Sequence, residues 1–238
     1  MRGAGPTDRI GVLISGRGSN MVAILDRIAS GALRATAAVV ISNEPGAPGI
    51  AAALKRGVEV LVIDHRDSAA REEHEARVAE ALEARGVGLV CLAGYMRLLS
   101  PWFVRRFRGR ILNIHPSLLP AFPGAHAQRQ ALEHGVKVSG CTVHFVDEEV
   151  DSGPIILQEA VAVRDGDTPE SLAARILRKE HRAYGRAIAL CLSGRLRFEG
   201  RRVLVGGRAR SPRRRPARRT RTPSIGGHGA APRRSRRG

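Results

Sequence analysis

Aromatic side chains are scarce in this chain, where Phe, Tyr and Trp together make up 3% of the 238 residues. Hydrophobic residues still amount to 43%, so Ala, Val, Ile and Leu must fill a core large enough for one sizeable domain. No apolar run approaches the roughly 18 residues of a membrane-spanning helix, and residues 1–8 lack the apolar centre of a secretion signal. We therefore expect neither a membrane span nor export.

Cysteine is equally sparse. Cys91, Cys141 and Cys191 are odd in number, show no Cys-x-x-Cys spacing and lie among apolar neighbours, where cysteine packs as a small hydrophobic residue. The histidines form no His-x-x-x-His pair and no Cys/His set, so no metal site is expected. These features indicate a reducing compartment, and we expect a cytoplasmic protein.

Acidic residues are missing from the last part of the chain. The formal net charge is +18, but residues 201–238 hold 14 Arg and no Asp or Glu, which leaves 26 basic against 22 acidic side chains in the first 200 residues. Such an Arg-rich segment cannot offset its ordering entropy, so we expect a domain over residues 9–200 and a disordered tail over 206–238. The tail could bind nucleic acid or an anionic membrane, although a solvated extension without a specific role explains it more simply.

Short apolar strands alternate with amphipathic helices through the first half of the chain. Strands are predicted at residues 9–14, 37–41, 58–63, 87–93 and 111–114, with helices at 21–30, 49–56, 69–85 and 100–107. Because each helix makes a right-handed crossover between parallel strands, this order predicts an α/β fold with a doubly wound, mostly parallel sheet.

The rhythm changes after residue 123. A helix is predicted at 126–133, followed by two strands at 138–146 and 155–163 with no long helix between them. This order predicts an antiparallel C-terminal portion of the sheet. Thr168 and Pro169 then form a good helix start, and that helix is expected to run to about Leu192.

The run Asn113-Ile114-His115 ends the last predicted parallel strand. Side chains alternate along a strand, so the Asn113 amide and the His115 imidazole share one face, at the edge where α/β sheets bind ligands. An amide and a protonated imidazole can stabilise a tetrahedral oxyanion, and a later carboxylate, Asp151, can keep the imidazole charged. The pattern indicates acyl transfer between nitrogen atoms, although His115 taken alone is also explained as a structural residue.

The segment Ser15-Gly16-Arg17-Gly18-Ser19-Asn20 joins the first strand to the first helix. Glycines permit a sharp turn, and free amides at a helix N-terminus bind anions. The segment lacks the Gly-Lys-Ser/Thr ending of a P-loop and the spacing of a dinucleotide fingerprint. We expect it to hold a phosphate monoester, with an ordinary strand-to-helix turn as the alternative.

Four segments, in order and sensibly spaced, resemble the phosphoribosylglycinamide formyltransferase (glycinamide ribonucleotide transformylase) family of purine synthesis. They are ISGRGSN at 14–20, LAGYMRLLS at 92–100, LNIHPSLLP at 112–120, and VHFV at 143–146 with DSGP at 151–154. The resemblance runs from about Arg9 to Leu196. It implies transfer of a formyl group from 10-formyltetrahydrofolate to the amine of glycinamide ribonucleotide, without a metal.

The resemblance also implies roles for individual residues. The catalytic group would be Asn113, His115 and Asp151. Substrate would be held by Gly18, Ser19 and Asn20 at its phosphate and by Glu180 at its amine end. The folate would contact Arg71, Met96, Arg97, Leu98, Leu99, His144, Asp147 and Val150. His126 also matches a family histidine, while Arg71 stands in altered surroundings and Glu180 is alternatively a solvated helix carboxylate.

Three alternatives stay open. Methionyl-tRNA formyltransferases share the Asn-x-His-Pro-Ser-Leu-Leu-Pro core, but we expect no folded tRNA-binding domain after Leu196. Formyltetrahydrofolate deformylases normally carry an N-terminal regulatory domain, and eight residues precede Arg9 here. A nucleic-acid-binding protein that acts through its tail is the reading from another class. The expected partners are small-molecule substrates, in a monomer or homodimer.

Overall fold

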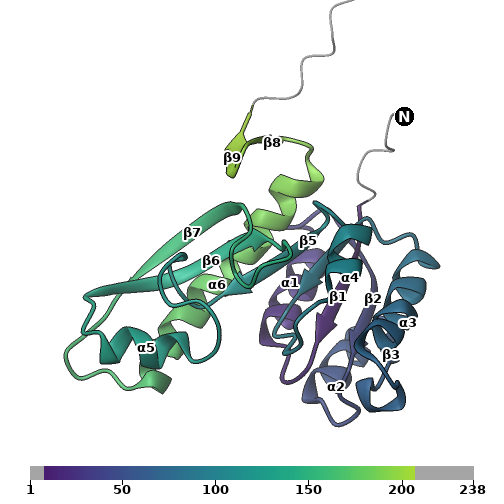
Figure 1. Ribbon diagram of the computed structural model, residues 1–238, viewed down its shortest axis with the longest axis horizontal. Helices are drawn as coiled ribbons and strands as arrows, with labels where there is room; N and C mark the ends of the chain where they lie inside the picture. The colour runs from purple at the N-terminus through teal and green to yellow at the C-terminus, as the bar shows by residue number, and fades with distance from the viewer. Residues whose placement is uncertain (1–7, 207–238) are drawn as a thin grey trace, which may run out of the picture.

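A computed structural model describes residues 8–206 of the chain, which are built around a seven-stranded sheet (Figure 1). Its strand order is β3-β2-β1-β4-β5-β6-β7. The strands are β1 Arg9–Ile14, β2 Thr36–Ser42, β3 Val60–Val62, β4 Leu89–Leu92, β5 Ile111–His115, β6 Val138–Phe145 and β7 Ile155–Ala162. β1 to β5 are parallel, whereas β6 and β7 each run antiparallel to the strand before them. The predicted α/β class and the antiparallel addition are confirmed.

Helices cover both faces of the parallel strands. They are α1 Ser19–Ala29, α2 Pro48–Leu54, α3 Arg71–Glu83, α4 Pro101–Arg106, α5 Ala127–Glu133 and α6 Pro169–Leu192, with a short 3-10 turn at His65–Asp67. Alternation along β1 explains the two layers, because Val12 and Ile14 join the hydrophobic cluster under α1 and α6, while Leu13 joins the cluster under α3 and α4. Aliphatic side chains dominate both clusters, as the shortage of aromatics requires.

The long helix α6 is fixed at its start and near its middle. The Thr168 side chain accepts a hydrogen bond from the Ser171 amide, and Pro169 occupies the first turn, as predicted. The fully buried Tyr184 hydroxyl lies 2.9 Å from the carbonyl oxygens of both Leu92 and Leu112, and burial raises the pKa of this phenol well above its usual value. Helix α6 is thereby tied to β4 at its last residue and to β5 at its second residue.

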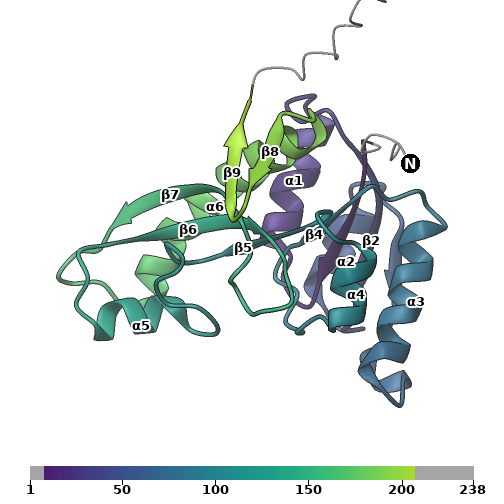
Figure 2. The ribbon, with the colours of Figure 1, turned by 45° about the horizontal axis from the view of Figure 1, so that its top comes forward.

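A separate two-stranded hairpin follows α6, with strands β8 Leu196–Glu199 and β9 Arg202–Val205 (Figure 2). The hairpin was not predicted, because its two strands are only four residues long and the second lies within the Arg-rich stretch that begins at residue 201. The predicted Arg-rich tail, apart from Gly206, lies outside the described residues. Within residues 8–206, no helix is long and apolar enough to cross a membrane.

Candidate active site

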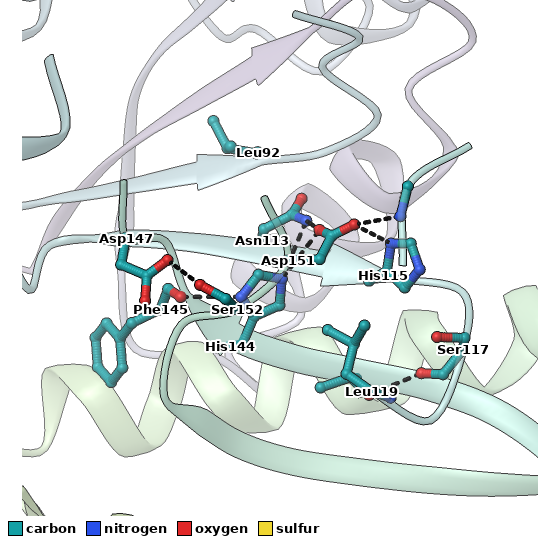
Figure 3. A network of polar contacts seen from close by, with 12 residues as sticks. Leu92, Asn113, His115, Ser117, Leu119, His144, Phe145, Asp147, Asp151 and Ser152 are labelled. Atoms are coloured by element: carbon teal, nitrogen blue, oxygen red, sulfur yellow. Dashed lines mark hydrogen bonds and ion pairs between the residues drawn. The ribbon is translucent and has the colours of Figure 1, made fainter. Parts of the chain in front are cut away.

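The predicted trio of Asn113, His115 and Asp151 comes together at the carboxyl end of β5 (Figure 3). His115 Nδ1 lies 3.2 Å from Asp151 Oδ2, and Asn113 Nδ2 lies 3.5 Å from Asp151 Oδ1. The His115 and Asp151 side chains are only 6% and 11% exposed, so solvent screens their attraction weakly. One carboxylate therefore contacts both β5 side chains across 38 residues of sequence.

Both ring nitrogens of His115 face oxygen acceptors. Nδ1 faces Asp151, and Nε2 lies 2.8 Å from the carbonyl oxygen of Phe122. Each nitrogen needs a hydrogen to bond an oxygen, so the doubly protonated imidazolium satisfies both contacts at once. These two contacts hold the ring of His115 in one orientation at the end of β5.

His144 lies on β6 opposite Asn113 and is almost fully buried. Desolvation lowers its pKa, which favours the neutral ring. In that form Nδ1 donates to the Phe145 carbonyl oxygen at 2.9 Å, and Nε2 accepts from Asn113 Nδ2 at 3.2 Å. In this structure His144 thus orients the Asn113 amide, a contact that the sequence analysis did not anticipate.

Asp151 sits at the tip of the segment that joins β6 to β7, residues 146–154, here called the Asp151 loop. Its φ of 52° lies in the left-handed region, an uncommon conformation for a residue with a side chain. The Gly124 amide donates to Asp151 Oδ2 at 2.8 Å, and Ser152 Oγ donates to Asp147 Oδ1 at 2.7 Å. A Cβ at Gly153 would lie 1.8 Å from the Phe145 carbonyl oxygen, so only glycine fits where this loop closes.

The glycine-rich loop after β1 has the geometry expected of an anion cradle. Gly18 caps α1 with a φ of 66°, and no described side chain caps the amides of the first turn. The Gly49 amide donates to the Gly16 carbonyl oxygen at 3.0 Å, and a Cβ on Gly49 would lie 2.8 Å from that oxygen. The loop is therefore supported from behind by backbone, while the amides of Ser19 and Asn20 begin the helix.

Asn20 and Glu180, 160 residues apart in sequence, meet across α1 and α6. Asn20 Nδ2 donates to Glu180 Oε2 at 2.7 Å, while the buried Asn20 Oδ1 has no hydrogen-bond partner among the described residues. Burial raises the pKa of Glu180, and the Asn20 bond partly opposes that shift. Glu180 is thus a buried carboxyl group beside the cradle rather than a solvated one.

The predicted folate segment lies beside the cradle. The Ser15 amide donates to the Gly94 carbonyl oxygen at 3.1 Å, and the Met96 amide donates to Ser15 Oγ at 2.8 Å. Met96 and Leu98 are 78% and 59% exposed, so both can be covered by a ligand, whereas Leu99 packs against the core.

The remaining predicted folate residues lie on either side of that segment. Arg71 begins α3 one turn before Glu75, which accepts hydrogen bonds from the Ser100 amide and hydroxyl. This contact places Arg71 beside residues 94–100, but no described contact shows where its side chain is used. Val150 is 53% exposed on the Asp151 loop.

Some groups around the site carry no side-chain signal in the sequence. The Phe122 carbonyl and the Gly124 amide contact His115 and Asp151 through the backbone, so residue identity could not announce them. The Pro123-Gly124 turn pair was the available hint.

His126, which was predicted to lie near the site, caps α5 with a φ of 60°. Within residues 8–206, no group of three or more His, Cys, Asp or Glu side chains is placed to hold a metal ion.

The chain is similar to a known family of proteins over most of its length. Residues 8–188 match the family model described as formyl transferase. The chain is 40% identical over 203 residues to the phosphoribosylglycinamide formyltransferase of Escherichia coli, covering 84% of this chain and 95% of the relative. It is 52% identical over 188 residues to the trifunctional purine biosynthetic protein adenosine-3 of Drosophila melanogaster, covering 78% of this chain but 14% of that much longer protein.

A solved structure gives the same picture. The glycinamide ribonucleotide transformylase 1 of Symbiobacterium toebii superposes with a TM-score of 0.83 at 56% sequence identity. The match covers 87% of this chain and 98% of the other. The fold of this chain is therefore that of a known group of enzymes.

Proposed function

Because the chain belongs to the formyl transferase family, within which it resembles phosphoribosylglycinamide formyltransferases, we propose that it transfers a formyl group from 10-formyltetrahydrofolate to the amine of glycinamide ribonucleotide. The observation that carries the proposal is the contact of Asn113, His115 and Asp151 beside the anion cradle. This reaction belongs to the synthesis of purines, in which the relatives named above take part.

The substrate phosphate would bind the amides of Gly18, Ser19 and Asn20. Helix N-termini bind anions because unpaired N–H groups and the helix dipole point at the ligand. Asn20 also contacts Glu180, whose buried carboxyl group would face the amine end of the substrate. An incoming ammonium group would favour the ionised form of Glu180 and offset part of its desolvation.

The formyl folate would lie between residues 94–100 and the Asp151 loop. The exposed Met96, Leu98 and Val150 side chains offer apolar contacts for its rings, and Arg97, Leu99, His144 and Asp147 complete the walls. Arg71 would reach its glutamate carboxylates, since a guanidinium pairs well with a carboxylate. The formyl carbon would then sit over Asn113, between the two substrates' binding sites.

In the proposed reaction the neutral substrate amine attacks the formyl carbon. A carbon–nitrogen bond forms, and the formyl oxygen becomes an oxyanion that accepts hydrogen bonds from Asn113 and protonated His115. The bond to N10 of the folate then breaks, N10 gains a proton, and the substrate nitrogen loses one through water ordered by Asp151. Holding both reactants together makes the step effectively unimolecular.

The contacts seen here indicate what must change when substrates bind. Asn113 Nδ2 holds Asp151 at 3.5 Å, longer than its bond to His144, so the oxyanion would replace the Asp151 contact. His115 would have to release the Phe122 carbonyl oxygen to present Nε2, which requires a shift of the ring or of residues 119–124. Catalytic hydrogen bonds often tighten only in the substrate complex.

The three cysteines are free and two of them, Cys91 and Cys141, are buried, which suits the reducing cytoplasm proposed for this enzyme.

Purified protein should be assayed with formyl folate and three acceptors: glycinamide ribonucleotide, charged initiator tRNA, and water. Formylation of the ribonucleotide alone is the expected result. Preferential formylation of tRNA, or release of formate, would replace the proposal with one of the two related activities.

A further inference from the structure

The β8–β9 hairpin, residues 196–205, lies beyond residues 8–188 that match the family model. It leaves the end of α6 and packs against the sheet at β7, near the loop that carries Asp151 (Figures 1 and 2). The inference below rests on the proposed function, because it concerns how Asp151 is held for that reaction.

The hairpin contacts the base of the Asp151 loop through two aromatic rings. Phe198 of β8 lies with its ring centroid 5.0 Å from that of Phe145, at an interplanar angle of 50°. Phe145 is the last residue of β6, and its amide donates to the Pro154 carbonyl oxygen at 2.9 Å, which closes the loop. In a protein with so few aromatic residues, a ring pair here is a substantial apolar contact.

The hairpin also contacts the tip of the loop. The Arg201 guanidinium, in the turn between β8 and β9, donates to the carbonyl oxygen of Ser152, the residue directly after Asp151. Ser152 itself is bonded through its hydroxyl to Asp147 on the other side of the loop. Ser152, the neighbour of Asp151, is thus held at its carbonyl oxygen by Arg201 and at its hydroxyl by Asp147.

Between these two contacts the hairpin stands away from the loop. A cavity of about 650 Å³ separates Val203 and Leu204 of β9 from Leu119, Pro120 and Val150. Because the hairpin does not pack continuously against the loop, Phe198 and Arg201 carry much of the contact that the described residues show between them. Two separated contacts, one at the base and one at the tip, restrict rotation of the loop as a single contact would not.

Asp151 needs such restraint. Its left-handed backbone conformation persists only where the surroundings hold it, and its carboxylate must contact His115, Asn113 and the Gly124 amide together. We propose that the β8–β9 hairpin is a clamp that fixes the Asp151 loop, with Phe198 and Arg201 as positioning residues for the reaction. Neither side chain touches the reacting atoms; both act through Asp151.

The test compares Arg201→Ala and Phe198→Ala with a matched control, Arg197→Ala, in the full chain. Arg197 lies on the same hairpin, but its ion pair is with Glu199 inside the hairpin. Loss of one restraining hydrogen bond or ring contact is expected to lower kcat about tenfold, with the KM for glycinamide ribonucleotide within about twofold. Arg201→Lys and Phe198→Leu, which retain a cation and an apolar side chain, should recover part of the loss.

A second readout reports position without activity. Long-range ¹H–¹⁵N NMR of the His115 ring is sensitive to the contact between Nδ1 and Asp151, and Asp151→Asn gives the reference spectrum for its alteration. Arg201→Ala and Phe198→Ala should move the Nδ1 resonance toward that reference, whereas Arg197→Ala should leave it in place. A role in general stability alone would lower Tm without moving this resonance.

The outcomes separate the clamp from the proposed function. If Asp151→Asn abolishes turnover while the two hairpin variants keep normal kcat and an unmoved resonance, the clamp is overturned and the function stands. If Arg197→Ala lowers kcat equally, the clamp is overturned because the hairpin acts only through stability. If the wild-type enzyme does not formylate glycinamide ribonucleotide, the function itself fails, and the NMR comparison still tests the positioning of Asp151.

Discussion

The glycine-rich loop after β1 and the Asp151 loop between β6 and β7 both contain a left-handed backbone turn, but they stabilise it in different ways. Each contains a residue at positive φ, but it is Gly18 at 66° in the first and Asp151 at 52° in the second. Glycine adopts this conformation at little cost, whereas a residue with a side chain pays about 1–3 kcal/mol. Both loops are contacted by distant segments, the first by Gly49 and Gly94, but only the second must hold a residue with a side chain in the left-handed conformation.

The difference follows from what each loop presents. The cradle uses backbone amides, which every residue supplies, so local conformation suffices. The Asp151 loop must aim one carboxylate at side chains of β5, and it is contacted by two other segments, through Gly124 and through Phe198 and Arg201 of the hairpin. The proposed phosphate site therefore uses backbone groups of one loop, while the proposed catalytic geometry is assembled over long range.

The largest expected effect comes from removing the proposed catalytic side chains. His115→Ala and Asp151→Asn should lower kcat by about 10²- to 10⁴-fold, with little change in the KM for glycinamide ribonucleotide, because the cradle is left intact. Steady-state kinetics measures both. Glu148→Gln, which alters an exposed ion pair with Arg105, serves as the control on the same loop. Normal turnover in both catalytic variants would refute the assignment.

Glu180→Gln tests the proposed role of Glu180 in binding the amine end of the substrate. Gln keeps an acceptor for Asn20 but has no charge, so the KM for glycinamide ribonucleotide should rise about tenfold.

The same variant should also change stability. Because the folded state raises the pKa of Glu180, ionisation of this group opposes folding as pH rises above its ordinary value of 4.5. The variant should thus have the higher Tm at neutral pH and lose that advantage below pH 4.5. Thermal unfolding across pH tests the sign, and a lower Tm at pH 7 would contradict it.

His144 offers a matched pair of variants. His144→Ala removes the acceptor that orients Asn113 and should lower kcat about tenfold, whereas His144→Gln retains a side-chain oxygen and should lose less. Kinetics with both substrates distinguishes this role from folate binding, which would raise the KM for the formyl donor instead. Equal losses of kcat in the two variants would argue against the orienting contact.

Removal of the Arg-rich segment after Gly206 should have the smallest effect. Formyl transfer is expected to stay within about twofold of the full chain, since the described site lies entirely before that point. Any RNA affinity, which grows with the number of phosphate contacts, should fall and lose its salt dependence. A loss of turnover on truncation would tie the tail to the reaction.

The parallel strands and the sharp turn before α1 could be predicted because their signals are local. Apolar runs, helix starts at Pro169 and the alternation that pairs Asn113 with His115 depend only on neighbouring residues. The contact of His144 with Asn113 and the backbone groups of Phe122 and Gly124 could not, since they arise from strand pairing and loop closure. The β8–β9 hairpin was missed because its strands are short and the apolar contact of Phe198 is with Phe145, which is distant in the sequence.

The position of Tyr184 bears on the distance between the two proposed substrate sites. Its hydroxyl bridges the backbones of β4 and β5, and it lies four residues, about one helical turn, after Glu180 on α6. Thermal drift of the helix would otherwise change the gap between a bound amine and a bound formyl carbon, and an error of about 1 Å in such a gap can slow a reaction about 100-fold. In the proposed reaction Tyr184 would thus fix the distance between the two substrates without contacting either of them.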